Sequence, residues 1–187
     1  HPFFGEPARK GAEKAGVPVV MAGGAGAGTL AEMSACAPIG SPHATSAEDT
    51  AVILYTSGTT GHPKGAELSH ANLFLNCAVV VPKLVPFTRT DLRALACLPL
   101  FHSFGYLGTL WWPLLARIPT AYHANPLQAA QVVRLIRDTR ATTLLTTPTL
   151  LQAYMRRATP QEFARLRRVF TGGEKLRAAL ADAFEQR

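Results

Sequence analysis

Hydroxyl side chains, glycines and a lysine are concentrated in residues 55–65, which read YTSGTTGHPKG. Glycines let several main-chain N–H groups turn towards one anion, because no Cβ stands in the way. Serine and threonine hydroxyls donate further hydrogen bonds to phosphate oxygens, and the ammonium group of Lys64 adds a mobile positive charge. We therefore predict that this segment is a loop that binds a polyphosphate.

A Walker-type phosphate loop is excluded by its own pattern. Counted from Gly58, that pattern requires glycine where Pro63 stands, and serine or threonine where Gly65 stands. A hairpin or linker rich in serine, threonine and glycine is the structural alternative. Such a segment would need neither Lys64 nor the buried strand that is predicted directly before the loop.

The elements that must position this loop follow from apolar periodicity and from helix-starting residues. Short apolar runs predict strands at residues 51–55, 95–98, 141–145 and 168–170, of which the first is expected to be buried. Helices are predicted after Ser69, after Asn125-Pro126, after Pro148 and over residues 176–186. Strands that alternate with helices predict an α/β fold in layers, with a largely parallel sheet flanked by helices.

The loop resembles the signature motif of the adenylate-forming (AMP-binding) superfamily, which includes acyl-CoA synthetases, firefly-type luciferases and the adenylation domains of peptide synthetases. Every position from Ile53 to Lys64 satisfies that signature. Two later segments are similar to further motifs of the family and follow in the family's order, residues 98–105 (LPLFHSFG) and residues 170–176 (FTGGEKL). Together they resemble the synthetases that load fatty acids onto acyl carrier protein.

The resemblance implies ATP and Mg²⁺ as cofactors, and a ligase that joins a carboxylic acid to AMP before it passes the acyl group to a thiol. It implies that seven residues hold the β- and γ-phosphates: Thr56, Ser57, Gly58, Thr59, Thr60, Gly61 and Lys64. His102 would border the acyl carboxylate and is expected, with Lys64, to take part in catalysis. The adenine would be bordered by Gly172, Gly173 and Glu174.

The substrate is expected to be an apolar acid, of the fatty-acid class, and not an amino acid. In the amino-acid-activating members an Asp follows the Phe of the second motif, whereas His102 follows Phe101 here. A buried ammonium group without a counter-charge is costly. Trp111 and Trp112 are expected to pack in the core, with a wall of the acyl pocket as the alternative. His102 can also be explained as a core residue, and Glu174–Lys175 as a solvated pair.

The chain ends before three features of the family. These are the motif whose Glu helps to hold Mg²⁺, the Asp that binds the ribose, and the small C-terminal domain with its catalytic lysine. We therefore expect residues 51–187 to be the central part of the AMP-binding domain, without metal ligands of its own. Residues 1–50 are expected to be a partial, loop-rich remnant or linker with a cut start at His1. The isolated chain is expected to be inactive.

Charge and cysteine content limit the partners and the compartment. The formal net charge of +7 favours acidic partners, such as ATP and either CoA or acyl carrier protein. Nucleic acid is not expected, because no basic stripe with interleaved aromatic residues is present. Cys36, Cys77 and Cys97 have no metal-binding spacing and are expected to be reduced thiols in the cytoplasm. A peripheral membrane association through lipid substrates stays open.

Two other classes of protein stay open. Residues 21–32 contain Gly26-x-Gly28-x-x-Ala31, the relaxed form of a dinucleotide fingerprint. That pattern would favour a Rossmann-type NAD oxidoreductase, although we expect a flexible loop because no helical periodicity follows Thr29. The other class is a non-catalytic module that binds a nucleotide or an acyl group.

Overall fold

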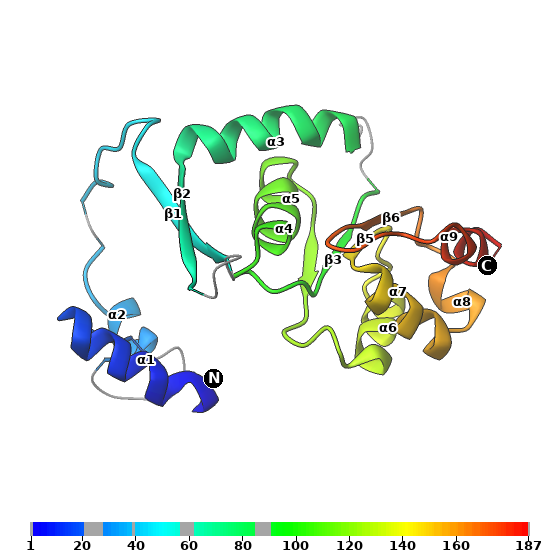
Figure 1. Ribbon diagram of the computed structural model, residues 1–187, viewed down its shortest axis with the longest axis horizontal. Coiled ribbons are helices and arrows are strands. Elements are labelled where there is room, and N and C mark those ends of the chain that lie inside the picture. The colour runs from blue at the N-terminus through cyan, green and yellow to red at the C-terminus, as the bar shows by residue number, and fades with distance from the viewer. Residues whose placement is uncertain (1, 21–27, 39, 57–61, 85–90, 187) are drawn as a thin grey trace. The chain divides into compact units, whose positions relative to one another are not determined.

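The structure, a computed structural model, describes residues 2–20, 28–38, 40–56, 62–84 and 91–186. It divides into two compact units, His1–Ala44 and Thr45–Arg187 (Figure 1). The first unit contains two helices, α1 (Pro2–Ala15) and α2 (Leu30–Ser34), in a segment expected to be rich in loops.

The dinucleotide fingerprint lacks the strand that it requires. Residues 17–20, which precede the glycine tract, form no strand, and Gly26 lies outside the described residues. The expectation that no helix follows Thr29 is wrong, because the Thr29 hydroxyl caps α2 by accepting a hydrogen bond from the Glu32 N–H at 3.2 Å. A phosphate-binding helix of the Rossmann type follows directly from a strand, so this segment does not support NAD binding.

The second unit begins with an antiparallel hairpin, β1 (Thr50–Thr56) and β2 (Lys64–Ser69). The strand predicted over residues 51–55 is confirmed, but its predicted burial is wrong, since Ile53 is 48% exposed and Tyr55 is 70% exposed. The physical reason is that β1 pairs only with β2 within the described residues, in a sheet of two strands. The strand β2 was not predicted.

The helix predicted after Ser69 is confirmed as α3 (His70–Leu84). It starts with two reciprocal hydrogen bonds: the Asn72 N–H donates to the Ser69 hydroxyl at 3.2 Å, and the Ser69 N–H donates to the Asn72 side-chain oxygen at 3.0 Å. Leu73, Cys77 and Val81 follow at intervals of four residues and are all buried. The cysteine thus serves as a small core residue.

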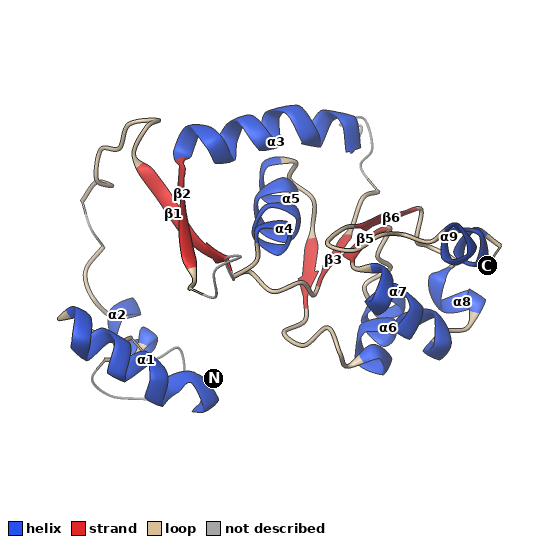
Figure 2. Ribbon diagram, viewed as in Figure 1, coloured by secondary structure: helices blue, strands red, loops and turns tan. Residues whose placement is uncertain are grey.

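A four-stranded parallel sheet organises the rest of the unit, with the strand order β4-β3-β5-β6. Figure 2 labels three of its strands, β3, β5 and β6. Its strands are β3 (Ala94–Ala96), β4 (Thr120–Tyr122), β5 (Thr143–Thr146) and β6 (Arg168–Thr171). Three of them were predicted, whereas β4, with three residues, was missed. The predicted α/β architecture with a largely parallel sheet is confirmed.

Helices cover both faces of this sheet. On one face the main core forms between the sheet and four helices, α6 (Ala129–Asp138), α7 (Pro148–Arg157), α8 (Pro160–Phe163) and α9 (Ala178–Glu185). Leu144 of β5 is fully buried in this core. Successive side chains alternate between faces, so Leu145 points the other way, where it lies so close to Gly108 that a Cβ there would overlap it.

The start of α6 differs from its prediction. We expected Asn125 to cap the helix and Pro126 to open it, but α6 begins only at Ala129. The Asn125 side chain instead accepts a hydrogen bond from the Leu127 N–H at 3.0 Å, which closes a local turn. The start of α7 agrees with its prediction, since Thr147 caps the helix and Pro148 occupies its first turn.

Residues 103–115 form one continuous helical segment of α4 (Ser103–Gly105), a π-helix η1 (Tyr106–Trp111) and α5 (Trp112–Leu115). Trp111 and Trp112 are both half-buried, and the Trp112 indole donates to the Asn76 side chain of α3 at 3.2 Å. This bond and the packing of Gly108 against Trp112 favour a structural role for the pair. Among the described residues, no helix is long and apolar enough to cross a membrane.

The central strand β5 generates a stability prediction. Replacing Leu144 by alanine removes a fully buried side chain and leaves a cavity, so the free energy of unfolding should fall by about 2–5 kcal/mol. The matched control is Leu114→Ala in α5, where the side chain is 60% exposed and the cost should stay below about 0.5 kcal/mol. Equal losses for the two variants in chemical denaturation would contradict the assigned core.

Candidate functional site

A pocket of about 460 Å³ opens where the strands of the parallel sheet end. Its walls come from four segments: Leu98 to Gly105 after β3, Pro126 and Leu127 before α6, Thr147 to Leu150 after β5, and Gly172 to Glu174 after β6. Ligands of open α/β sheets bind in the crevice outside the carboxyl ends of the strands. The topology therefore brings the second and third motifs of the sequence to one site, although they are far apart along the chain.

His102 lines this pocket and begins α4. Its Nδ1 accepts a hydrogen bond from the Phe104 N–H at 3.2 Å, which caps the helix. In a neutral imidazole the nitrogen that accepts is unprotonated, so the proton is on Nε2. His102 is exposed and is not the core residue that we considered as an alternative. Its Nε2–H is left as a hydrogen-bond donor.

The glycine pair after β6 is required by local geometry. Gly173 has a φ of +80°, in the left-handed region that favours glycine. Gly172 lies against the ring of Phe104, where an added Cβ would be 3.1 Å from the ring carbons. The Gly172 N–H donates to the Thr146 carbonyl at 3.2 Å, which holds this turn to the end of β5.

Glu174 is fixed by the first turn of α7. Its carboxylate accepts hydrogen bonds from the Thr149 hydroxyl at 2.6 Å and from the Thr149 N–H at 3.2 Å. The Thr149 hydroxyl bond is the main cause that lowers the pKa of Glu174 below its ordinary value. A negative charge at this end of a helix is also favoured by the helix dipole. Glu174 thus positions the adjoining glycines, and it is not merely a solvated partner of Lys175.

Sequence analysis missed Thr149 and Leu127 as pocket residues. Thr149 follows the helix start at Pro148, and main-chain donors at a helix start could have suggested an acidic partner. No sequence signal indicated Leu127, because it lies in the turn that replaces the expected start of α6.

The two residues that flank the undescribed part of the predicted phosphate loop are the facing ends of β1 and β2. Thr56 ends β1, Lys64 begins β2, and the two residues are paired in register. Both are exposed, and neither is among the residues that line the pocket described above. Five predicted site residues lie outside the described residues: Ser57, Gly58, Thr59, Thr60 and Gly61.

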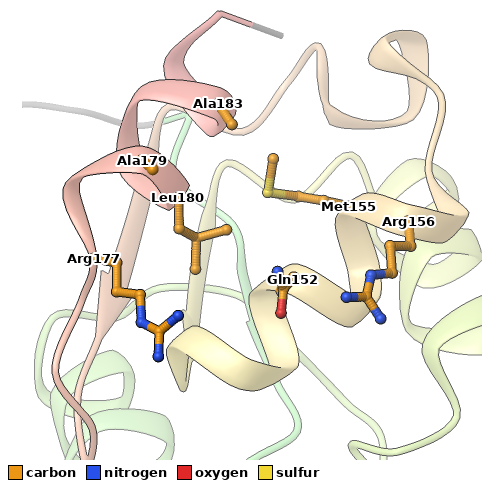
Figure 3. A pocket seen from close by; sticks show the side chains of 7 residues that line it. All are labelled: Gln152, Met155, Arg156, Arg177, Ala179, Leu180 and Ala183. Carbon is orange, nitrogen blue, oxygen red and sulfur yellow. The ribbon is translucent and has the colours of Figure 1, made fainter.

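Two further pockets are lined in part by α7, and His102 lines neither of them. A pocket of about 260 Å³ also includes Thr149 and Glu174, and it shares Gln152 and Arg177 with a third pocket of about 370 Å³. The third pocket lies between α7 and α9, and its lining includes Arg156 and Arg177 (Figure 3). No site residue predicted from the sequence lines this third pocket.

Mg²⁺ would neutralise phosphate charge when bound. Within the described ranges, no group of three or more His, Cys, Asp and Glu side chains is placed to hold a metal ion. The described residues therefore do not fit a metal site, and no chemical step is assigned to one. All three cysteines are free, with Cys77 and Cys97 buried and Cys36 exposed.

Comparison with known proteins identifies the class to which this fold and site belong. The family model of AMP-binding enzymes matches residues 6–187, and the chain belongs to this adenylate-forming family. Membership agrees with the resemblance of the three motifs. It excludes the alternative that the chain is a Rossmann-type NAD oxidoreductase. The chain covers only part of the large N-terminal domain of such enzymes.

Relatives and solved structures place the chain within the family. It is 33% identical over 142 residues to a feruloyl-CoA synthase of Amycolatopsis sp, covering 75% of this chain and 28% of that protein. It is 31% identical over 147 residues to the fatty acid–[acyl-carrier-protein] ligase ScoC of Streptomyces coeruleorubidus, again covering 75% and 28%. The chain thus spans about 28% of the length of these curated relatives.

Two solved structures from Rhodopseudomonas palustris share the fold. A putative long-chain-fatty-acid CoA ligase superposes with a TM-score of 0.74 at 25% identity, over 90% of this chain and 40% of that one. ATP-bound MatB superposes with a TM-score of 0.66 at 31% identity, over 76% and 28%.

The Glu174–Thr149 contact predicts a specific titration. Replacing Thr149 by valine removes the hydroxyl donor, so the pKa of Glu174 should rise towards its ordinary value. Thr149→Ser keeps the donor and should leave the pKa low. Because the folded-state pKa is lowered, the contact stabilises the fold above the ordinary pKa, and this contribution is lost as the pH falls through the lowered value. Carbon-13 NMR of the Glu174 carboxyl checks this, and identical titrations in the parent and Thr149→Val would refute the assignment.

Proposed function

We propose that the full-length protein is an ATP-dependent acid–thiol ligase that forms an acyl-adenylate and then transfers the acyl group to a thiol. The observation that carries the proposal is the pocket in which His102 and the segment Gly172 to Glu174 lie together, in a chain of the AMP-binding family. These are the segments whose motifs suggested binding of the acid and of adenine.

The proposed reaction has two steps. A carboxylate oxygen of the acid attacks the α-phosphorus of ATP, and pyrophosphate leaves with the bridging oxygen and its electron pair. The sulfur of the acceptor thiol then attacks the acyl carbon, its proton passes to solvent, and AMP leaves as the acyl C–O bond breaks. Both steps depend mainly on positioning the reactants and on stabilising negative charge. Hydrogen-bond donors and cations that are held in place make both contributions.

The hairpin loop is proposed to hold the β- and γ-phosphates. Its two ends, Thr56 and Lys64, lie opposite each other in the register, so an ammonium group and a hydroxyl flank the loop. In this role Lys64 stabilises the charge that develops on the leaving pyrophosphate. The loop glycines and hydroxyls supply the remaining donors.

The acid is proposed to be apolar and unsubstituted. Apolar side chains dominate the pocket wall, and among them Phe101 and Leu127 are each 79% exposed. An alkyl chain that covers them gains about 0.8 kcal/mol for each buried CH₂ group. The His102 Nε2–H can donate to the carboxylate of the acid.

An amino-acid substrate is disfavoured by the charges around the pocket. His102 stands in the pocket lining directly after Phe101, where amino-acid-activating members of the family carry an Asp. A substrate ammonium group would therefore lack that counter-charge.

The acceptor is proposed to be CoA or acyl carrier protein. Relatives named as a feruloyl-CoA synthase and as a fatty acid–[acyl-carrier-protein] ligase support both choices. The net charge of +7 suits either one, since both carry negative charge. We expect the protein to be cytoplasmic, with a peripheral membrane association where the substrate is a lipid. A non-catalytic module that binds ATP or acyl groups is the alternative, and it predicts binding without turnover.

The phosphate-loop assignment predicts a large effect at Lys64. In the full-length protein, Lys64→Ala should lower acid-dependent exchange of pyrophosphate into ATP by at least about 10²-fold, as expected for loss of a positioned charge-stabilising group. The fold should survive, because Lys64 is exposed. The control is Lys83→Ala, which removes an exposed lysine from the last turn of α3 and should exchange at the parental rate. Parental exchange by folded Lys64→Ala would show that the loop does not act on the phosphates.

The pocket lining predicts the substrate class. The full-length protein with ATP should prefer medium or long fatty acids over leucine and phenylalanine, as judged by kcat/KM for adenylation. The physical reason is the apolar wall, together with His102 in place of an acidic residue after Phe101. A higher kcat/KM for either amino acid would overturn the substrate assignment, and no exchange with any acid would favour the non-catalytic module.

A further inference from the structure

Tyr154 is a fully buried tyrosine of α7 whose hydroxyl contacts Thr146 of β5 and two partners from more distant segments. The Tyr154 Oη–H donates to the Pro126 carbonyl at 2.8 Å, and Oη lies 3.5 Å from Cys97 Sγ. Because the phenolic proton is given to the carbonyl, the Cys97 S–H is the donor in the second contact. Burial raises the pKa of Tyr154 above its ordinary value, so the hydroxyl keeps the proton that it donates.

The Tyr154 residue and its two partners belong to three different walls of the candidate pocket. Pro126 lines the pocket together with Leu127, and Cys97 directly precedes Leu98, the first residue of the β3 wall. The helix that bears Tyr154 supplies the third wall through Thr149 and Leu150. One oxygen atom therefore links three segments that are otherwise distant along the chain.

The Pro126 wall depends on this link more than the other two walls do. The other hydrogen bonds of residues 125–127 in the described structure are local: the Leu127 and Gln128 N–H groups donate to Asn125, and the Ala129 N–H donates to Leu127. The side chain of Leu127 is 79% exposed and so gains little from packing. This bond is part-buried, but Tyr154 itself is fully buried, so water cannot reach its hydroxyl without opening the core.

We propose that Tyr154 is a positioning and specificity-determining residue: its hydroxyl sets the separation of the three pocket walls and thereby which acids fit. The proposal rests on the proposed function, because it takes the pocket to be the acid site. Tyr154 itself is not a catalytic residue, since it does not line the pocket. Its effect reaches the acid through Pro126 and Leu127.

The test compares Tyr154→Phe with a matched control in the full-length protein. Tyr122 also donates its hydroxyl to a main-chain carbonyl, that of Thr109, at 2.9 Å, but it does not line the pocket or bond to its walls. Each Tyr→Phe change therefore removes one hydroxyl and one bond of similar length to a main-chain carbonyl, and Tyr154→Phe also removes the Cys97 contact. A third variant, Cys97→Ala, removes only the weaker partner of Tyr154.

Pyrophosphate exchange with fatty acids of increasing length gives the functional outcome. In Tyr154→Phe the KM for the acid should rise about 5- to 10-fold, as expected for one lost hydrogen bond, and the preference among chain lengths should flatten. The kcat and the KM for ATP should stay within about twofold of the parent. Tyr122→Phe should match the parent, and Cys97→Ala should shift the acid KM in the same direction by less. A parental acid KM and length profile in Tyr154→Phe, or equal changes in both KM values and in kcat, would overturn the proposal.

Hydrogen–deuterium exchange separates this proposal from the proposed function. The amides of residues 127–129 should exchange faster in Tyr154→Phe than in the parent, and at the parental rate in Tyr122→Phe. Parental exchange at these amides in Tyr154→Phe would refute the positioning role even in an inactive protein. If these amides do exchange faster but no acid supports pyrophosphate exchange in the parent, the proposed function fails instead. Should Tyr154→Phe not fold, an unchanged acid KM in Cys97→Ala would count against the proposal.

Discussion

Two buried strands, β3 and β5, lie side by side in the parallel sheet, with Leu95 opposite Leu144. Because the strands run in the same direction, the segments that leave them emerge at one edge, and the β6 turn joins them there through its pairing with β5. The positions of the three pocket walls that follow β3, β5 and β6 depend on this pairing. The fully buried residues of both strands make that pairing hard to shift, since a slip by one residue would move each side chain to the other face.

The glycine turn after β6 shows that individual residues of the pocket wall are also held in fixed positions. Gly172 packs against Phe104 and Gly173 takes a left-handed conformation, so neither position tolerates a side chain easily. The same turn ends in Glu174, whose carboxylate is bonded to the start of α7. Backbone conformation, aromatic contact and helix capping therefore hold one short segment in one place, which suits it to form a fixed wall for a planar ligand.

The features that could be predicted from the sequence were those determined by residues close together along the chain. The cap at Ser69, the helix start at Pro148 and the apolar runs of β3, β5 and β6 carry their signals within a few residues. The missed features depend on distant contacts. The edge strand β4 is too short to show a pattern, the exposure of β1 depends on which strands pair with it, and the turn at Asn125 competes with helix capping. Among pocket residues, His102, Gly172, Gly173 and Glu174 came from motif resemblance, whereas Thr149 and Leu127 became apparent only when the chain was folded.

The antiparallel register of β1 and β2 determines which insertions and deletions would move the Lys64 side chain. Side chains of a strand alternate between its two faces, and Lys64 keeps its face only while Thr56 remains its partner. Deleting one residue between Gly65 and Ser69 would turn the ammonium group to the opposite face unless the pairing adjusted elsewhere. The irregular pairing between Thr50 and Val52 is at the far end of the hairpin and can absorb such a change. Insertions and deletions near Thr50 should therefore leave the face of Lys64 unchanged, whereas those beside Lys64 should reverse it.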